Sequence, residues 1–120
     1  MMVGDVARRL DLKIVAGDNR LDREVTGGYV GDLLSCVMAG AASGNLWVTI
    51  QRHPNVVAVA TLVGISGIIV TEGAGIDQGV AQRADQEGIP ILSSSKPSFE
   101  VVADLVSLGI TGKHVEATDS

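Results

Sequence analysis

Aromatic side chains are scarce in this sequence. Its 120 residues include one Trp, one Tyr and one Phe, although 46% of the residues are hydrophobic. The hydrophobic core must therefore consist mainly of Val, Ala, Leu and Ile, which suits helices packed closely on a parallel sheet. A chain of this length corresponds to one domain of ordinary size, which buries roughly two thirds of its unfolded surface.

Cysteine and histidine are scarce as well. The single cysteine, Cys36, excludes an internal disulfide, and one cysteine with two distant histidines argues against a zinc site. The N-terminus lacks the basic lead and apolar run of a signal peptide. The longest apolar stretch, residues 56–63, is far shorter than the ~20 residues that span a bilayer. We therefore expect a soluble, cytoplasmic protein that does not associate with membranes.

Basic clusters beside aromatic residues are lacking. The net charge is −5, and the acidic residues are scattered along the chain. Nucleic acid is therefore not an expected partner. An acidic protein can still bind a small anion at one local basic site.

Helical and extended patterns alternate along the chain. Helices are predicted over residues 3–10, after Asp32 as a cap, from Pro54 to Gly64, over residues 77–87, and after Ser98 as a cap. Extended segments are predicted over residues 13–16, 21–25, 46–50, 67–70 and 90–92, and the second of these ends at Thr26-Gly27-Gly28.

This order of elements predicts an α/β fold. Three successive strand-helix-strand passes require a parallel sheet with right-handed crossovers. We expect a single three-layer domain over residues 1–110, with a mainly parallel sheet flanked by helices. Residues 111–120 are polar, and we expect them to form a disordered tail.

Polar residues and glycines gather in the segments that follow the predicted strands. Ligands of open parallel sheets bind outside the carboxyl ends of strands, where helix N-termini direct free N–H groups toward the site. We therefore predict that a small anion binds at this edge. The predicted ligand-binding residues are Thr26, Gly27, Gly28, Gln51, Arg52, His53, Thr71, Gly73, Ser93, Ser94 and Ser95.

Each of these groups also has a structural alternative. Arg52 and His53 precede the helix that Pro54 starts, where charge and helix dipole would favour an anion, but His53 could instead cap that helix. The pair Gly27-Gly28 could let the backbone approach a phosphate or could simply form a turn. The three serines equally suit a helix cap and a turn.

A catalytic constellation is not evident. Cys36 falls within a predicted helix with no histidine nearby in sequence, which favours a structural thiol over a nucleophile. The acidic residues show no spacing typical of paired catalytic carboxylates. Gly73-Ala74-Gly75 lacks the third glycine of a dinucleotide fingerprint. We predict that the protein is not an enzyme and that it uses no metal and no cofactor.

The segment Asn55–Val63 has almost no polar face. A helix that is apolar all round must be buried on every side, whereas an outer helix on a small sheet has one covered face. We therefore predict a homodimer in which this helix meets a second copy by a two-fold contact. The β-branched residues would also permit a strand here, and a strand would remove this argument.

The segment Asp22-Arg23-Glu24-Val25-Thr26-Gly27-Gly28, with the residues that follow to Ser35, resembles the signature of the DRTGG domain. The similarity continues through residues 46–51, 55–60 and 67–71, so it covers almost the whole chain. It implies a fold like the N-terminal domain of HPr kinase/phosphatase. DRTGG domains also accompany CBS domains in regulated pyrophosphatases and occur in long phosphotransacetylases, where they serve regulation and oligomer assembly. The resemblance implies no catalytic residues.

Three functions are consistent with these observations. The first is a stand-alone, non-catalytic regulatory module, a homodimer that senses a small anionic metabolite or nucleotide and acts on a partner protein. The second is a purely structural adaptor without a ligand. The third is a small transferase or hydrolase, which would need the rim loops to assemble a compact acid/base or nucleophile cluster.

Overall fold

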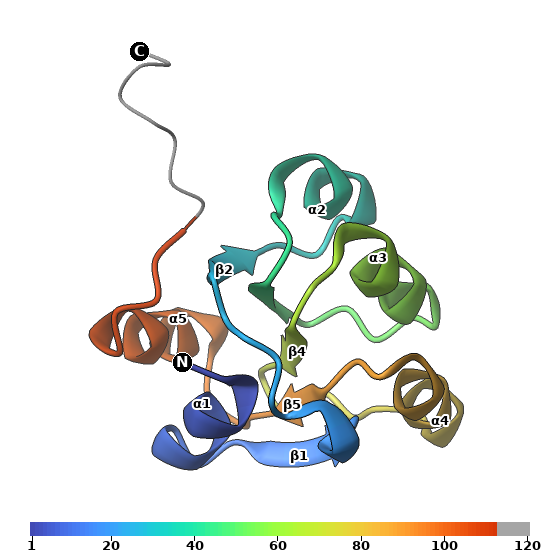
Figure 1. Cartoon of the computed structure of the whole chain (residues 1–120), viewed down its shortest axis with the longest axis horizontal. Coiled ribbons are helices and arrows are strands. Elements are labelled where there is room, and N and C mark those ends of the chain that lie inside the picture. Colours follow the sequence, from blue (N-terminus) through green and yellow to red (C-terminus); the bar gives the residue numbers. More distant parts are fainter. Residues whose placement is uncertain (113–120) are drawn as a thin grey trace.

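The computed structural model describes residues 1–112, which form a three-layer α/β sandwich (Figure 1). The strands are β1 (Lys13–Ala16), β2 (Gly27–Val30), β3 (Asn45–Thr49), β4 (Gly67–Val70) and β5 (Ile91–Ser93). The helices are α1 (Val3–Arg9), η1 (Asp18–Arg20, a 3-10 turn), α2 (Leu34–Gly40), α3 (Asn55–Val63), α4 (Gln78–Glu87) and α5 (Ser98–Ser107). The predicted fold class is confirmed.

The five strands form one sheet in the order β1-β5-β4-β3-β2. β2, β3, β4 and β5 are parallel to one another, and β1 pairs with β5 in the antiparallel direction. β1 and β2 are therefore the two edge strands. Because β1 runs opposite to the rest, its first residue lies at the edge of the sheet where the parallel strands end.

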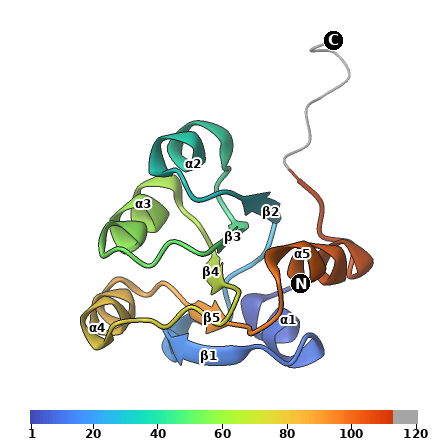
Figure 2. The ribbon, with the colours of Figure 1, turned by 180° about the vertical axis from the view of Figure 1, so that it is seen from behind.

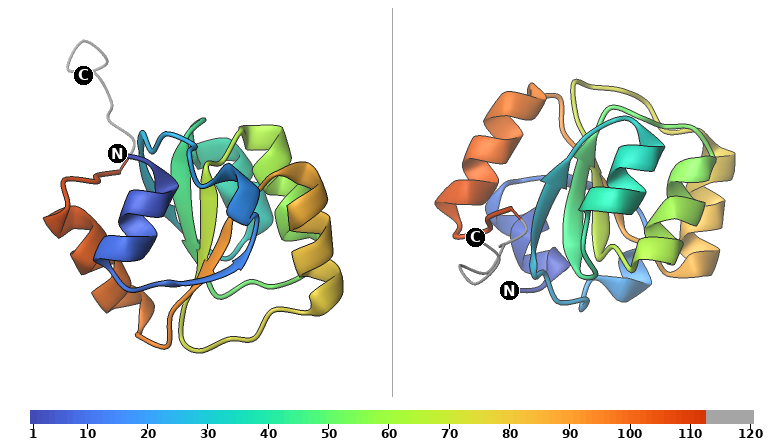
Figure 3. Two further views of the ribbon diagram at one scale, coloured as in Figure 1. Left: turned by 60° about the horizontal axis from the view of Figure 1, so that its bottom comes forward. Right: turned by 90° about the horizontal axis from the view of Figure 1, so that it is seen from above.

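Helices cover both faces of the sheet: α2, α3 and α4 lie on one face, and α1 and α5 lie on the other (Figures 2 and 3). On the face of α2, α3 and α4, buried side chains such as Trp47, Ile68 and Val57 form one core cluster. On the face of α1 and α5, Leu46, Val48 and other buried side chains form the second. Alternate residues of β3 thus point to opposite faces, as the period of a strand requires.

Two helices end where the sequence predicts. Gly64 follows α3 with φ of 86°, and Gly88 follows α4 with φ of 69°. Both are left-handed conformations that glycine adopts without a steric penalty. In both cases the glycine ends the helix and turns the chain toward the next buried strand.

The predicted strand over residues 21–25 is wrong. These residues form only an isolated bridge between Met2 and Glu24, and the strand begins two residues later, at Gly27. Gly27 and Gly28 are strand residues paired with Asn45 and Leu46, not the turn that ends a strand. Glycine is unfavourable in strands by propensity. Close packing overrides that preference here, because a Cβ on Gly27 would lie 2.9 Å from the carbonyl oxygen of Thr111.

Two predicted helix caps are also wrong. Asp32 lies before α2, but its carboxylate accepts hydrogen bonds from the Thr49 hydroxyl at 2.8 Å and from the Ile50 N–H at 2.9 Å. Leu33 occupies the N-cap position of α2. Ser98 is the first residue of α5, and its hydroxyl bonds to the hydroxyl of Thr71. In both cases the side chain that the local pattern assigned to a helix cap instead hydrogen-bonds to a residue at the end of another strand.

Most of the predicted tail, including His114, lies outside the described residues. Its first residue, Thr111, accepts a 2.8 Å hydrogen bond from the N–H of Gly28 and so lies beside edge strand β2. None of the helices within residues 1–112 combines the length and the apolar character needed to cross a membrane.

Candidate functional site

A groove opens at the edge of the sheet where β5 ends and β1 begins. Lys13 of β1 pairs with Ser93 of β5, so the start of one strand and the end of the other share this edge. The loop between β4 and α4 forms the opposite wall. The groove has a volume of about 700 Å³ and is lined by Leu10, Asp11, Lys13, Val15, Gly73, Ala74, Gly75, Ile76, Ser93, Ser94, Ser95 and Lys96. Four predicted site residues, Gly73 and the three serines, are among them.

Two cationic side chains line this groove. Lys13 is exposed and makes no ion pair with any residue in the described part of the chain. The Lys96 ammonium lies 3.1 Å from the Asp104 carboxylate and is still about half exposed. Asp11 contributes one negative charge to the lining. The lysines and the serine hydroxyls together provide donors for an anionic group.

The floor of the groove is apolar. Val15, Ala74 and Ile76 are half-buried and pack against the core cluster beneath α3 and α4. A ligand in this groove would therefore meet an apolar surface on one side and charged or hydroxyl groups on the other. Binding pockets for nucleotides and similar small molecules commonly combine these two features.

Backbone hydrogen bonds hold the two walls together. The N–H of Glu72 donates to the carbonyl of Lys96 at 2.9 Å, and the N–H of Gly73 donates to the carbonyl of Ser94 at 3.1 Å. Glu72 and Gly73 both have positive φ, of 64° and 69°. A positive φ is uncommon for a non-glycine residue such as Glu72. The loop after β4 is thereby fixed against the loop after β5.

The side chain of Glu72 caps the N-terminus of α5, a position where an anion could otherwise bind. Its carboxylate accepts a 2.9 Å hydrogen bond from the N–H of Ser98, the first residue of α5. A carboxylate at this position satisfies a free N–H and interacts favourably with the helix dipole. The N-terminus of α5 is therefore already neutralised by the protein itself.

Arg52 and His53 lie at the same edge of the sheet, beyond the β4–α4 loop. Arg52 is exposed, and its Nη1 atom donates a long, 3.4 Å hydrogen bond to the carbonyl of Gly75, a residue of the groove wall. His53 accepts a 3.1 Å hydrogen bond from the N–H of Asn55 through Nδ1 and so caps α3. The structural alternative for His53 is the one observed. Arg52 borders the groove without lining it.

The remaining rim residues serve the loops. Gln51 accepts a 3.2 Å hydrogen bond from the N–H of His53, and its side-chain amide donates to the carbonyl of Asp32 at 3.5 Å. Thr71 is fully buried, and its hydroxyl bonds to Ser98. Neither residue lines the groove.

Thr26, Gly27 and Gly28 lie at the opposite end of the sheet, where the parallel strands begin. They stand at the start of β2, beside Asn45 at the start of β3, whereas the groove lies at the ends of the parallel strands. The expectation that these three residues share one rim with Arg52 and the serines is therefore wrong. Its cause is the misplaced strand, because a strand over residues 21–25 would have put them after a strand end.

The segment Asp22 to Gly28 is hydrogen-bonded to other elements of the fold. Its Arg23 side chain donates a 3.0 Å hydrogen bond to the carbonyl of Gly88, at the end of α4. Partial burial lowers the pKa of the Arg23 guanidinium below its usual value. The Thr26 hydroxyl donates to the carbonyl of Ser43 at 2.8 Å. These bonds attach the segment to the ends of other elements and assign it a structural role.

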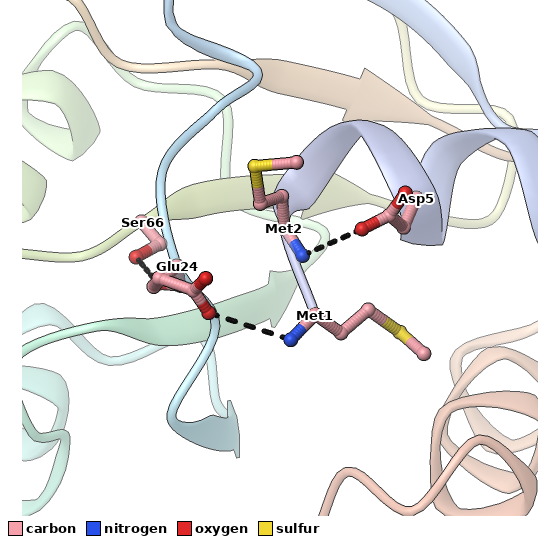
Figure 4. A network of polar contacts seen from close by, with 5 residues as sticks. All are labelled: Met1, Met2, Asp5, Glu24 and Ser66. Carbon is pink, nitrogen blue, oxygen red and sulfur yellow. Dashed lines mark hydrogen bonds and ion pairs between the residues drawn. The ribbon is translucent and has the colours of Figure 1, made fainter.

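The same segment holds the N-terminal residues (Figure 4). The carboxylate of Glu24 lies 3.4 Å from the Met1 ammonium, and its carbonyl accepts the hydroxyl hydrogen of Ser66. One residue further, the N–H of Met2 donates to the Asp5 carboxylate at 2.9 Å. This hydrogen bond lowers the pKa of Asp5 below its ordinary value, and the charge of Arg8 acts in the same direction.

Lys13, Lys96 and Asp11 are groove residues that the sequence reasoning did not select as ligand residues. Lys13 was missed because it begins a strand, and residues at the start of parallel strands lie at the wrong edge for a ligand. Only the antiparallel direction of β1 brings it to this edge. Lys96 lies in the loop after β5, next to the three predicted serines, but nothing in the local pattern marks it as a binding residue.

Helix α3 is covered more completely than the sequence reasoning assumed. It lies between α2 and α4 on the sheet, and Val56, Val57, Val59 and Ala60 are buried. Its outer face is small and carries Leu62, which is 74% exposed. The apolar composition of α3 is therefore largely explained by contacts within one chain, and it no longer requires a second copy.

Comparisons with known proteins agree with this fold. A model of the DRTGG domain family matches residues 5–108. The crystal structure of the CBS and DRTGG domains of the regulatory region of Clostridium perfringens pyrophosphatase, complexed with the activator diadenosine tetraphosphate, is similar with a TM-score of 0.71 and 15% identity. The match covers 97% of this chain and 53% of that chain, so this chain spans about half of its length. No curated protein matches the chain.

Proposed function

Because this chain belongs to the DRTGG domain family, we propose that it is a non-catalytic regulatory and assembly module. It binds a small anionic metabolite or nucleotide in the groove between β1, β5 and the β4–α4 loop. It forms a homodimer and acts on a partner protein. The groove itself carries the proposal, since it combines two lysines, three serines and an apolar floor in about 700 Å³.

The chemistry of the groove favours a ligand with a phosphate or another anionic group. A lysine ammonium binds a phosphate as a compact point charge, and serine hydroxyls add neutral hydrogen bonds. The apolar floor formed by Val15, Ala74 and Ile76 suits a flat base or an aliphatic group. A nucleotide offers both parts in one molecule. The pyrophosphatase regulatory region that shares this fold was solved with a nucleotide activator.

The lack of catalysis is supported by how the reactive side chains at this edge are used. Asp32 accepts hydrogen bonds from Thr49 and Ile50, Glu72 caps α5, and His53 caps α3. A general base must be free to reach a proton of the substrate. Within residues 1–112, no three His, Cys, Asp or Glu side chains are grouped in a way that could hold a metal ion.

Thermal unfolding with added ligands tests the proposal. We expect ATP and diadenosine tetraphosphate to raise the Tm of the full chain, because a ligand that binds only the folded state stabilises it. Adenosine should act weakly, since it lacks the anionic group. Lys13→Met should weaken nucleotide binding about ten-fold or more, because a charge-assisted hydrogen bond contributes roughly 1.5–3 kcal/mol.

Arg83→Met is the matched control. Arg83 is an exposed cation on α4 that pairs with Glu87 at 3.7 Å, and it does not line the groove. Its removal makes the net charge of −5 more negative by the same one unit and should leave nucleotide affinity unchanged. Equal losses in both variants would mean that binding reflects overall charge. If no anion shifts the Tm, the chain is instead a structural adaptor, and hydrolysis of a nucleotide by purified protein would contradict the absence of catalysis.

A further inference from the structure

One part of this chain is poor in charged residues. Residues 25–51 contain a single charged side chain, Asp32, although the whole sequence has 9 Lys and Arg and 14 Asp and Glu residues. The carboxylate of Asp32 is directed to the Thr49 hydroxyl and the Ile50 N–H. Depletion of charge over an exposed surface distinguishes the centre of protein interfaces from the rest of a protein surface.

The uncharged residues build the end of the molecule formed by β2, α2 and β3 (Figure 1). Several large apolar side chains are exposed there, including Val30 at 54% and Leu33 at 64%. An apolar groove of about 140 Å³ lies between β2 and α5, and its lining includes Val30, Val102 and Val106. We call this surface the β2 end and define it by the exposed Val30 and Leu33 of the charge-poor stretch and by the exposed Val106 of α5, which lies beside the groove.

Among residues 1–112, no strand pairs with the outer edge of β2, which is therefore open at Val30. The N–H of Gly31 donates to Val48 of β3, so the N–H and C=O of Val30, the preceding residue, point away from the sheet. Two residues before Val30, the N–H of Gly28 donates to the carbonyl of Thr111. Natural edge strands are usually protected by Lys, Pro or another charge. Gly27–Val30 has none of these.

We propose that the β2 end binds a second copy of this chain across a two-fold axis. The inference rests on the homodimer included in the proposed function and moves its contact from α3 to the β2 end. A two-fold contact places one surface on itself, so Val30 of one copy meets Val30 of the other. Two antiparallel Val30 residues can exchange both of their outward N–H···O=C hydrogen bonds. The apolar groove supplies side-chain contacts beside this pair.

Charge favours a second copy as the occupant. Each chain carries a net charge of −5, so two copies repel each other over most of their surfaces. As far as residues 1–112 are concerned, the β2 end is a surface on which two acidic copies meet without placing like charges opposite one another. A basic partner protein would gain no attraction from an uncharged surface and would prefer the acidic remainder.

Mass measurement by light scattering and sedimentation tests this placement. The full chain should be a dimer at micromolar concentration. Val30→Lys should make it a monomer, because it places two like charges at the two-fold axis. Leu62→Lys is the matched control, since Leu62 is an exposed apolar residue on α3, and this variant should remain a dimer. Circular dichroism should show both variants folded, because both side chains are exposed.

A mixing experiment tests the two-fold geometry itself. Val30→Glu should also be a monomer, and equal amounts of Val30→Lys and Val30→Glu should form a mixed dimer, because residue 30 of each copy then meets the opposite charge. Failure to form this mixed dimer would overturn the two-fold contact at Val30. A dimer broken by Leu62→Lys but not by Val30→Lys would overturn the β2 end alone. A monomeric wild-type chain would overturn both this inference and the homodimer, while the nucleotide titration would still decide ligand binding.

Discussion

Thr26 and Asn45 form a hydrogen bond at the start of two neighbouring strands. The side-chain amide of Asn45 donates to the Thr26 hydroxyl at 3.3 Å, and that hydroxyl donates to the carbonyl of Ser43. The other side-chain atom, Asn45 Oδ1, accepts the N–H of Ala42 at 3.0 Å. Asn45 is almost fully buried, so Thr26 satisfies a polar group that water cannot reach.

Thr26→Val should therefore lower the stability of the domain. Valine has a similar shape but leaves the buried Asn45 amide without this partner, which costs about 1–3 kcal/mol. Urea unfolding of wild type and variant measures the difference. Thr61→Val is the control, because the Thr61 hydroxyl only donates to a carbonyl of its own helix. Thr26→Ser should restore most of the loss. Equal effects at positions 26 and 61 would contradict the role assigned to Thr26.

Gly27→Ala should destabilise the domain by steric conflict. The added methyl group would lie 2.9 Å from the carbonyl oxygen of Thr111 and 3.2 Å from the Asn45 amide. A forced shift of this kind costs about 1–3 kcal/mol in a well-packed region. Gly79→Ala is the opposite case, because Gly79 lies in α4 with open space around its Cα. Alanine there should stabilise by about 0.5–1 kcal/mol in the same urea experiment. A Gly27 variant as stable as wild type would refute the close contact.

The fold could be predicted because buried strands and glycine-ended helices leave strong local signals. The apolar run of β4 and the glycine after α3 are examples. The start of β2 could not be predicted in this way. Gly27 and Gly28 have low strand propensity, and their conformation depends on Thr111, which lies more than eighty residues away in the sequence. Long-range packing of this kind leaves no trace in a local pattern.

The candidate site was predicted in part for a related reason. Ser93 ends the parallel strand β5, Ser94 and Ser95 follow it, and the edge rule placed all three at the ends of the parallel strands. Lys13 begins a strand, and its position depends on the antiparallel direction of β1. That direction is a property of the assembled sheet. Local sequence also put Thr26 at the wrong end of the sheet. A strand over residues 21–25 would place Thr26 after a strand end, whereas the observed strand β2 begins after Thr26.

Arg23→Met should lower stability through the end of α4. The variant loses the charged hydrogen bond to the Gly88 carbonyl, a contribution of about 1.5–3 kcal/mol at most because Arg23 remains partly exposed to solvent. Arg20→Met serves as control, since Arg20 is exposed and pairs with Asp22 at the surface. Hydrogen exchange should show faster opening of the last turn of α4 in Arg23→Met only. Unchanged exchange there would argue against this attachment.

Asp5 makes the stability of the N-terminal region depend on pH. Its pKa is lowered in the folded state, chiefly by the hydrogen bond from the N–H of Met2. The stabilisation is therefore complete above the ordinary value of 3.8 and is lost as the pH falls through the lower, folded-state value. Wild type should be more stable than Asp5→Asn near neutral pH, and the difference should vanish in acid. A difference that grows on acidification would have the wrong sign.

Arg52→Ala should leave the fold intact and change ligand binding less than Lys13→Met does. Arg52 makes one long hydrogen bond to Gly75 and lies at the border of the groove, whereas Lys13 lines it. The expected change in stability is within about 0.5 kcal/mol, as for most exposed positions. Isothermal titration with ATP compares the two variants directly. A larger loss of affinity in Arg52→Ala would shift the anion toward the loop after β3.

The antiparallel pairing of β1 with β5 also sets the order in which the chain can fold. On the ribosome, β1 is made well before its partner strand, because about 80 residues separate Lys13 from Ser93, with which it pairs. The N–H of Gly17 donates to the carboxylate of Asp85, which is made 68 residues later. Pairings this distant in sequence close late, because their loop entropy must be overcome first. The wall of the groove that carries Lys13 is therefore completed late, after β2, β3 and β4 have been made.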